Sequence, residues 1–169
     1  MCGICAILIK SPVYCLEDEK VIHHQATKKL IHRGPDFFGI RENQTGHNIL
    51  GHTRLAIVDP ISGEQPLIND QSILTVNGEI YNHLELEKKL KVAHLLKTKS
   101  DCEVLMYLIQ RSIKSSVSNN LSHENHFDLI SLESSLNHIV GMFAFVWSHL
   151  ENDTYLIARD PCGIIPVYY

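Results

Sequence analysis

The sequence lacks long hydrophobic runs, clusters of basic residues and a dense set of cysteines. Its longest apolar runs, residues 4–9 and 142–147, fall well short of the roughly 17 to 25 residues that a membrane helix needs. Lys and Arg number 15 against 19 for Asp and Glu, a net charge of −4, and no basic stripe is present to follow phosphates. A secretory signal has Lys or Arg before its apolar segment, and this sequence has none there. We therefore expect a cytoplasmic protein that binds neither nucleic acid nor a membrane.

The cysteines are odd in number and scattered, unlike the framework of a small disulfide-rich domain. They are Cys2, Cys5, Cys15, Cys102 and Cys162. Cys2 and Cys5 form a C-x-x-C pair, but no second pair and no suitably spaced histidine follows to complete a zinc site. A reducing compartment and no metal are the simpler expectations. A disulfide between Cys2 and Cys5 under oxidation, giving an inactive but reducible state, is a separate hypothesis.

Cys2 stands where it could become the first residue of the mature chain. Initiator methionine is normally removed before a small residue, which would leave Cys2 with a free α-amino group. An unperturbed α-amine titrates near pH ~8 and a thiol near ~8.5, so the amine is matched to accept the thiol proton. This arrangement pairs a nucleophile with a built-in base. The alternative is that Cys2 is a small buried residue that opens a strand.

The 169 residues have the length of one domain, and 44% hydrophobic with 20% charged residues is ordinary for a globular protein. Hydrophobic patterning predicts strands at 2–9, 49–58, 72–76, 139–148, 154–159 and 164–169, and helices at 19–31, 82–91, 101–113 and 127–136. Asn77-Gly78 is predicted to form a tight turn. The Ser- and Asn-rich stretch 115–125 is predicted to be a surface insertion without chemistry. The apolar segment 164–169 would leave an uncovered strand edge, which indicates a fragment of a longer protein.

Several motifs follow one another along the chain. Cys2-Gly3-Ile4 precedes His-Arg-Gly-Pro-Asp at 32–36, His-Thr-Arg-Leu-Ala-Ile-Val-Asp at 52–59, Gln-Pro-Leu at 65–67, Asn-Gly-Glu-Ile-Tyr-Asn at 77–82 and Ser-Asp-Cys-Glu at 100–103. Segments 141–145 and 159–166 add two later blocks. In order and spacing these motifs resemble the glutaminase domain of glutamine-dependent asparagine synthetase, a class II glutamine amidotransferase. The resemblance covers nearly the whole chain except the insertion.

The resemblance implies a fold and a reaction. The fold is α+β, the four-layer αββα sandwich of two antiparallel sheets of N-terminal nucleophile hydrolases, with residues 1–169 forming one glutaminase domain that is incomplete at its C-terminus. The reaction is hydrolysis of L-glutamine to glutamate and ammonia through a Cys2 thioester. In the family, a C-terminal synthetase domain, absent from this chain, uses the ammonia for ATP-dependent conversion of aspartate to asparagine. No cofactor or metal is implied for the glutaminase step, whereas ATP and magnesium belong to the absent domain. The full-length form could be a homodimer.

The resemblance also implies the catalytic roles. Cys2 is the nucleophile, and its own α-amine is the base. Asn77 through its side-chain amide and Gly78 through its backbone N–H supply the oxyanion hole. Arg33 and Gly34 shape the surroundings of Cys2. The alternative for Asn77-Gly78 is a simple hairpin turn.

Substrate binding is implied for a second set of residues. Arg54 binds the α-carboxylate of L-glutamine with the paired hydrogen bonds of a guanidinium, and Asp101, assisted by Glu79, binds the α-ammonium. The bland alternatives are a surface arginine at a strand end and an aspartate that caps a helix. The remaining residues implied to line the glutamine site are Leu55, Ala56, Ile57, Val58, Asn77 and Gly78.

Two other functions stay open. The motifs could survive in a non-catalytic relic or interaction fragment, if a missing C-terminal part prevents a stable sandwich. The domain could also be an amidotransferase that supplies ammonia to another acceptor.

Overall fold

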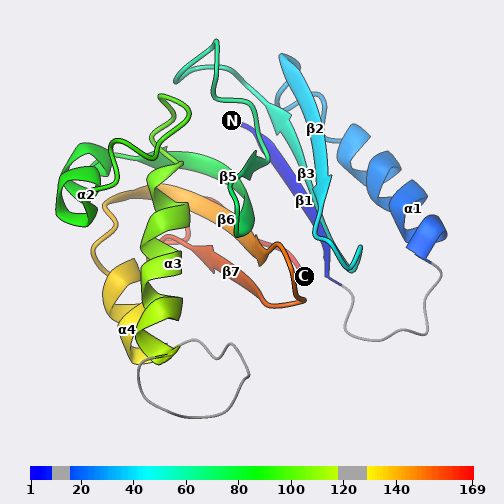
Figure 1. Ribbon diagram of the computed structural model, residues 1–169. Helices are drawn as coiled ribbons and strands as arrows, with labels where there is room; N and C mark the ends of the chain where they lie inside the picture. The colour runs from blue at the N-terminus through cyan, green and yellow to red at the C-terminus, as the bar shows by residue number, and fades with distance from the viewer. Residues whose placement is uncertain (9–15, 118–128) are drawn as a thin grey trace.

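The chain folds into two facing antiparallel sheets with helices on both outer sides, as the computed structural model shows for residues 1–8, 16–117 and 129–169 (Figure 1). The first sheet has the order β1-β3-β2, with β1 (Gly3–Leu8), β2 (Phe37–Glu42) and β3 (Asn48–Arg54). The second has the order β4-β5-β6-β7, with β4 (Leu67–Ile68), β5 (Ser72–Ile80), β6 (Gly141–His149) and β7 (Tyr155–Arg159).

The helices form the two outer layers. Helix α1 (Leu16–Lys28) packs on β1 and β3, and α2 (His83–Leu90), α3 (Val104–Val117) and α4 (Leu129–Leu136) lie on the outer side of the second sheet (Figure 1). The order of layers is therefore αββα, and the predicted α+β class with two antiparallel sheets is confirmed. None of the described helices has the length and apolar character needed to cross a membrane.

Alternate side chains of β5 pack into two different hydrophobic cores, one under the helices and one between the sheets. Leu74 and Val76 face the helices and belong to the main core. Ile73 packs with Leu50 between the two sheets. Because successive side chains of a strand point to opposite faces, Asn77 faces the first sheet, as Ile73 does.

The space between the sheets also holds buried polar pairs. His52 Nδ1 lies 2.9 Å from Thr75 Oγ1, and Asn48 Nδ2 donates to Ser148 Oγ at 3.0 Å. Burial, with a smaller effect from the charge of Arg54, lowers the pKa of His52 to about 3. The imidazole between the sheets is therefore neutral at pH 7.

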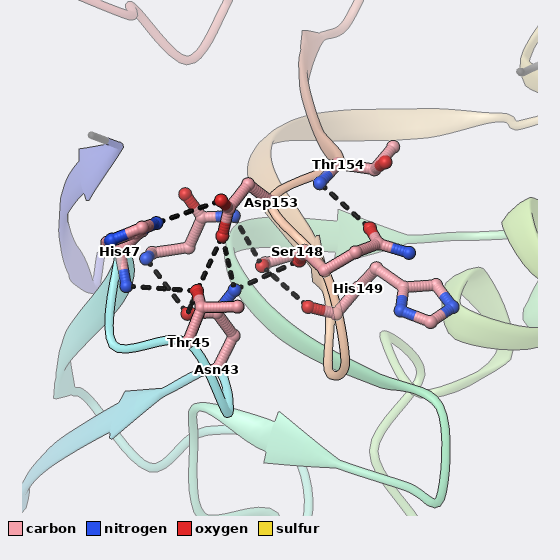
Figure 2. Close-up of polar contacts among 9 residues, drawn as sticks. Asn43, Thr45, His47, Ser148, His149, Asp153 and Thr154 are labelled. Carbon is pink, nitrogen blue, oxygen red and sulfur yellow. Dashed lines mark hydrogen bonds and ion pairs between the residues drawn. The ribbon is translucent and has the colours of Figure 1, made fainter. Parts of the chain in front are cut away.

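A polar cluster of Asn43, Thr45, His47 and Asp153 joins the β2–β3 turn to the β6–β7 turn (Figure 2). Asp153 Oδ2 pairs with His47 Nδ1 at 2.8 Å, and Oδ1 accepts hydrogen bonds from Thr45 Oγ1 at 2.5 Å and Asn43 Nδ2 at 3.2 Å. Partial burial raises the pKa of Asp153, but these hydrogen bonds outweigh it and leave that pKa below its usual value. The polar cluster thus ties the two sheets together at one end of the sandwich.

The predicted turn at Asn77-Gly78 is wrong. Strand β5 continues through both residues, with Asn77 opposite Ala144 and Gly78 opposite Phe143. Gly78 has φ of 147°, and a Cβ atom there would lie 2.0 Å from the carbonyl oxygen of Met142. Glycine is needed here because two strands approach closely, so the residue marks a tight strand pair and not a turn.

The predicted strand at 164–169 is also wrong. No strand is assigned there, because the buried Asp160 carboxylate accepts hydrogen bonds from the backbone N–H groups of Ile164 and Ile165. The predicted strand 49–58 ends at Arg54, because the next residues leave the sheet as a loop. Strands β2 and β4 are additions that the patterning did not predict.

Other boundaries shift by a few residues. The predicted helix 19–31 runs from 16 to 28, the predicted helix 101–113 begins at Val104, and the predicted helix 82–91 spans 83–90. Residues 115–117 of the predicted insertion end α3. The rest of that insertion, residues 127 and 128 of the predicted helix 127–136, and Cys15 lie outside the described residues.

Candidate active site

A pocket opens at the end of the sandwich where β1 begins, and it collects most of the predicted site residues. Strand β1 pairs Gly3 with Thr53, which places the preceding residue level with the end of β3. The predicted site residues that line the pocket are Cys2, Arg54, Leu55, Ile57, Val58, Asn77, Gly78, Glu79 and Asp101. They come from the start of β1, the loop after β3, the end of β5 and the segment before α3.

Cys2 is fixed at the pocket by backbone contacts. Leu55 N donates to Cys2 Sγ at 3.3 Å, and Sγ in turn lies 3.8 Å from Leu55 O. Arg33 Nε donates to the carbonyl oxygen of Cys2 at 3.0 Å. A Cβ atom on Gly34 would lie 2.3 Å from the carbonyl oxygen of Thr53, so only glycine lets this segment pack against the end of β3. Arg33 thus contacts Cys2, and Gly34 packs against the end of β3, both outside the residues that line the pocket.

Cys5 faces away from the pocket. Ala6 and Leu8 of β1 pack between the sheets, and Cys2 shares their side of the strand. The Cys5 side chain faces α1 instead, where burial raises the pKa of its thiol against a weaker effect of a hydrogen bond with Thr27. Three residues of extended chain separate the two Cα atoms by roughly 10 Å, more than the ~7 Å that a disulfide tolerates. Both thiols are free in this structure, and a Cys2–Cys5 disulfide would require the backbone of β1 to move.

The edge of β5 supplies a backbone donor to the pocket. Val76 N donates to Gln65 Oε1 at 2.7 Å, and Ile80 N donates to Asp101 Oδ2 at 2.6 Å. Backbone groups of alternate residues in a strand point to the same edge. Gly78 lies between these two residues, so its N–H points to that edge as well, at the wall of the pocket.

Asn77 brings a side-chain donor to the same wall. Its side chain faces the first sheet, is only 6% exposed and lines the pocket. Within the described parts of the chain its amide has no hydrogen-bond partner, although buried polar groups normally have one. The side chain of Asn77 and the backbone of Gly78 therefore line the same pocket as Cys2.

Arg54 is a buried cation at the other side of the pocket. Its side chain is 5% exposed, and Nη2 donates to Val58 O at 3.0 Å and to Asp59 O. These contacts wrap the loop after β3 around the guanidinium. Among the residues that the structure describes, Nε and Nη1 make no hydrogen bond. Arg54 thus keeps donors for an anion, and its burial contradicts the alternative of a surface arginine at a strand end.

The loop residue Ala56 is the one predicted glutamine-binding residue that does not line the pocket. Its N–H donates to Asp36 Oδ2 at 2.8 Å, outside the cavity. The neighbouring residues Leu55, Ile57 and Val58 do line it. Asp36 therefore holds Ala56 on the side of the loop away from the pocket, while the neighbours of Ala56 face the pocket.

Asp101 and Cys102 line the pocket from the segment before α3. Asp101 is 6% exposed and lies three residues before the start of α3, so it does not cap that helix. Burial and the negative charge of Asp101 raise the pKa of the Cys102 thiol well above its usual value. The protonated thiol lies 4.0 Å from Gly78 O as a donor. Glu79, partly exposed, borders the same region.

Several lining residues were not predicted. They are Met1, Gly63, Gln65, Val76, Ser100, Cys102, Met142 and Ile165. Five of them fall inside motifs or segments quoted from the sequence, and this was the available signal: Gln65, Ser100, Cys102, Met142 and Ile165. The pairing of β5 with β6, which local sequence does not reveal, places Met142 opposite Glu79 at the pocket.

Comparison with known proteins decides the family. The family model described as a glutamine amidotransferase domain matches residues 1–121. The chain belongs to this family. The amidotransferase domain is 38% identical over 173 residues to asparagine synthetase (glutamine-hydrolyzing) 1 of Arabidopsis thaliana and 40% identical over 170 residues to asparagine synthetase (glutamine-hydrolyzing) 2 of Oryza sativa subsp. japonica. Each match covers 99% of the chain and 25% of the relative, so the chain spans about a quarter of the length of the curated relatives it matches.

The fold of the amidotransferase domain has a counterpart among solved structures. Glutamine phosphoribosylpyrophosphate amidotransferase from B. subtilis superposes with a TM-score of 0.59 at 23% identity, covering 96% of this chain and 37% of that chain. At this level of identity the likeness shows a shared fold. The predicted family and fold are both confirmed.

Proposed function

We propose that the amidotransferase domain hydrolyses L-glutamine to glutamate and ammonia, with Cys2 as the nucleophile. One observation carries the proposal: a partly exposed thiol, the Asn77 amide, the Gly78 backbone, a buried guanidinium and a buried carboxylate line one pocket. An amide is a poor electrophile, so its hydrolysis needs a nucleophile, a proton carrier and donors for the oxyanion. Each of these has a candidate in the pocket.

The chemical step begins at the sulfur of Cys2. After removal of Met1, the α-amino group takes the thiol proton while Sγ bonds to the side-chain carbonyl carbon of glutamine. The C–N bond then breaks, and the proton leaves with the nitrogen as ammonia. Water hydrolyses the resulting thioester, which releases glutamate and returns the thiol.

The negative charge on the carbonyl oxygen is stabilised by Asn77 and Gly78. Both residues line the pocket, and the β5–β6 pairing holds their backbone in place, which supports this role. Donors that are fixed before the reaction need no reorganisation, and each contributes about 3 kcal/mol to transition-state stabilisation.

The α-groups of glutamine bind at the two sides of the pocket. Arg54 offers Nε and Nη1 to the α-carboxylate, because Nη2 is already engaged by the loop. Asp101, assisted by Glu79, accepts the α-ammonium. Loop residues 55–58 complete the site. Recognition of both charged groups distinguishes glutamine from a simple amide.

We further propose that the ammonia serves the synthesis of asparagine from aspartate. The names of the relatives, asparagine synthetase (glutamine-hydrolyzing), support this acceptor. In the full-length protein a C-terminal synthetase domain would use ATP and magnesium, whereas the glutaminase step is proposed without a cofactor. A cytoplasmic location and a homodimeric full-length form belong to the same proposal.

The test combines intact mass with activity on the purified chain. We expect loss of Met1, a covalent adduct on Cys2 with the glutamine analogue 6-diazo-5-oxo-L-norleucine, and release of ammonia from glutamine. A Cys2→Ala chain should show neither adduct nor ammonia. If the chain has lost Met1 but forms no adduct and releases no ammonia, the proposal fails for this chain and the non-catalytic alternative is favoured.

A further inference from the structure

Asp59 organises the loop that follows β3. Its φ of 51° is in the left-handed region. Its Oδ1 accepts a hydrogen bond from Ser62 N at 3.0 Å, and its Oδ2 accepts hydrogen bonds from Ser62 Oγ at 2.5 Å and Lys99 N at 2.8 Å. The contacts with Ser62 close a turn within the loop. The contact with Lys99 crosses to a segment 40 residues further along the chain.

Of the two segments that Asp59 joins, one holds a charged residue of the pocket and the other carries one. The backbone carbonyls of Val58 and Asp59 hold Nη2 of Arg54. Lys99 lies two residues before Asp101 in the segment that leads to α3. A single carboxylate therefore connects the residues that hold Arg54 with the segment that carries Asp101.

We propose that Asp59 is a positioning residue that sets the separation of Arg54 and Asp101. The inference rests on the proposed function, in which these two residues bind the α-carboxylate and the α-ammonium of glutamine. A ligand that engages both groups needs them at a fixed separation. Loss of the contact between Asp59 and Lys99 therefore weakens the binding of glutamine.

The reacting centre is held by contacts that do not involve the Asp59 side chain. Leu55 N fixes the sulfur of Cys2, and the pairing of β5 with β6 fixes Asn77 and Gly78. Asp59 therefore acts on the KM for glutamine and leaves kcat nearly unchanged. A general structural role would not separate these two quantities.

Asp59→Asn is the sharpest variant. Asparagine tolerates the left-handed region, and its Oδ1 can still accept the hydrogen bond from Ser62 N. Its amide nitrogen replaces the oxygen that accepts Lys99 N, so the crossing contact is lost. Two matched controls leave that contact in place: Ser62→Ala removes only the hydroxyl inside the loop, and Lys99→Ala keeps the backbone N–H that donates.

Binding is measured by calorimetry in a Cys2→Ala background, with L-glutamine and with glutaramate, the same molecule without the α-amino group. We expect Asp59→Asn to raise the Kd for glutamine about tenfold, the size of effect that loss of a hydrogen bond to a charged group produces. The Kd for glutaramate should change little, because that ligand does not engage Asp101. Ser62→Ala and Lys99→Ala should leave both Kd values unchanged. In the chain with intact Cys2, Asp59→Asn should raise KM and spare kcat.

Two outcomes overturn the inference and leave the proposed function standing, when the unmodified chain releases ammonia. One is an unchanged Kd for glutamine in Asp59→Asn. The other is equal weakening of glutamine and glutaramate, which indicates general damage to the pocket. If the Cys2→Ala chain binds no glutamine and the unmodified chain forms no adduct, the proposed function fails and the inference fails with it.

Discussion

Asn77 and Gly78 owe their positions at the pocket to the pairing of two long strands. Asn77 lies opposite Ala144, and Gly78, without a side chain, lets the backbone of Met142 approach closely. Neighbouring N–H groups on the same edge of β5 are taken by Gln65 and Asp101. The donors at the pocket are thus part of a sheet, which holds them more firmly than a free turn would.

Asn77→Ala is expected to lower kcat about 100-fold, because it removes one preorganised donor worth about 3 kcal/mol in the transition state. The KM for glutamine should change much less, since Arg54 and Asp101 remain. Steady-state ammonia release measures both values, and labelling of Cys2 with iodoacetamide checks that the nucleophile is intact. Asn137→Ala, an exposed position outside the pocket, is the matched control. Activity of Asn77→Ala within about threefold of the unmodified chain would exclude this residue from the oxyanion hole.

The residues of the pocket could be predicted because their chemistry is concentrated in short motifs. Cys2, Arg54 and Asp101 each stand in a motif quoted from the sequence, and the fold brings them together. The role of Asp59 could not be predicted in the same way. It depends on a contact with the backbone of Lys99, 40 residues away. Every residue except proline has a backbone N–H, so the residue type at position 99 does not indicate this contact.

The helices and strands that could be predicted are those whose own hydrophobic pattern determines their secondary structure. Helices α1, α2 and α3 fall within a few residues of their predicted ranges. Strand β2 exists because its whole length pairs with β3, and β4 has two residues that pair with β5. Such strands are fixed by their partners more than by local preference. Helix α3 begins late because Glu103 is engaged by the backbone of Lys97 and Thr98.

The polar cluster joins two turns, so its loss should affect stability and not catalysis. Strand β1 pairs Leu8 with Asn48 at the end that carries the cluster and Gly3 with Thr53 at the end that carries the pocket. Five residues at about 3.3 Å each place the two ends roughly 17 Å apart. Asp153→Asn should therefore lower the free energy of unfolding by about 0.5–1 kcal/mol, the usual value of an exposed ion pair with its hydrogen bonds, and leave kcat unchanged.

Urea unfolding and ammonia release measure the two effects of Asp153→Asn separately. Glu151→Gln, an exposed position in the same turn, removes a carboxylate that is outside the polar cluster and should leave stability unchanged. A fall in kcat for Asp153→Asn, or equal destabilisation by the two variants, would contradict the assignment of a local, structural role.

The sandwich contains two buried histidines, one between the sheets and one between α1 and the first sheet. His52 and His23 are both fully buried, and burial lowers the pKa of each. His23 Nε2 lies 3.2 Å from Cys5 O under α1, and His52 Nδ1 lies 2.9 Å from Thr75 Oγ1 between the sheets. Neither ring can gain a proton in the folded state without placing a charge in the interior. The stability of the sandwich is therefore linked to pH through these two residues.

Stability should fall as the pH drops below about 6.5, the pKa of an ordinary histidine. The folded pKa of His52 is about 3, so between these values the unfolded chain binds a proton that the folded chain does not. Each such group lowers the free energy of unfolding by about 1.4 kcal/mol per pH unit. In His52→Asn, which can keep a hydrogen bond to Thr75, urea unfolding at pH 6 and pH 5 should show a pH slope smaller by about 1 kcal/mol per unit. His94→Asn, at an exposed position, should keep the slope of the unmodified chain, and an unchanged slope in His52→Asn would show that His52 is not the group that couples folding to pH.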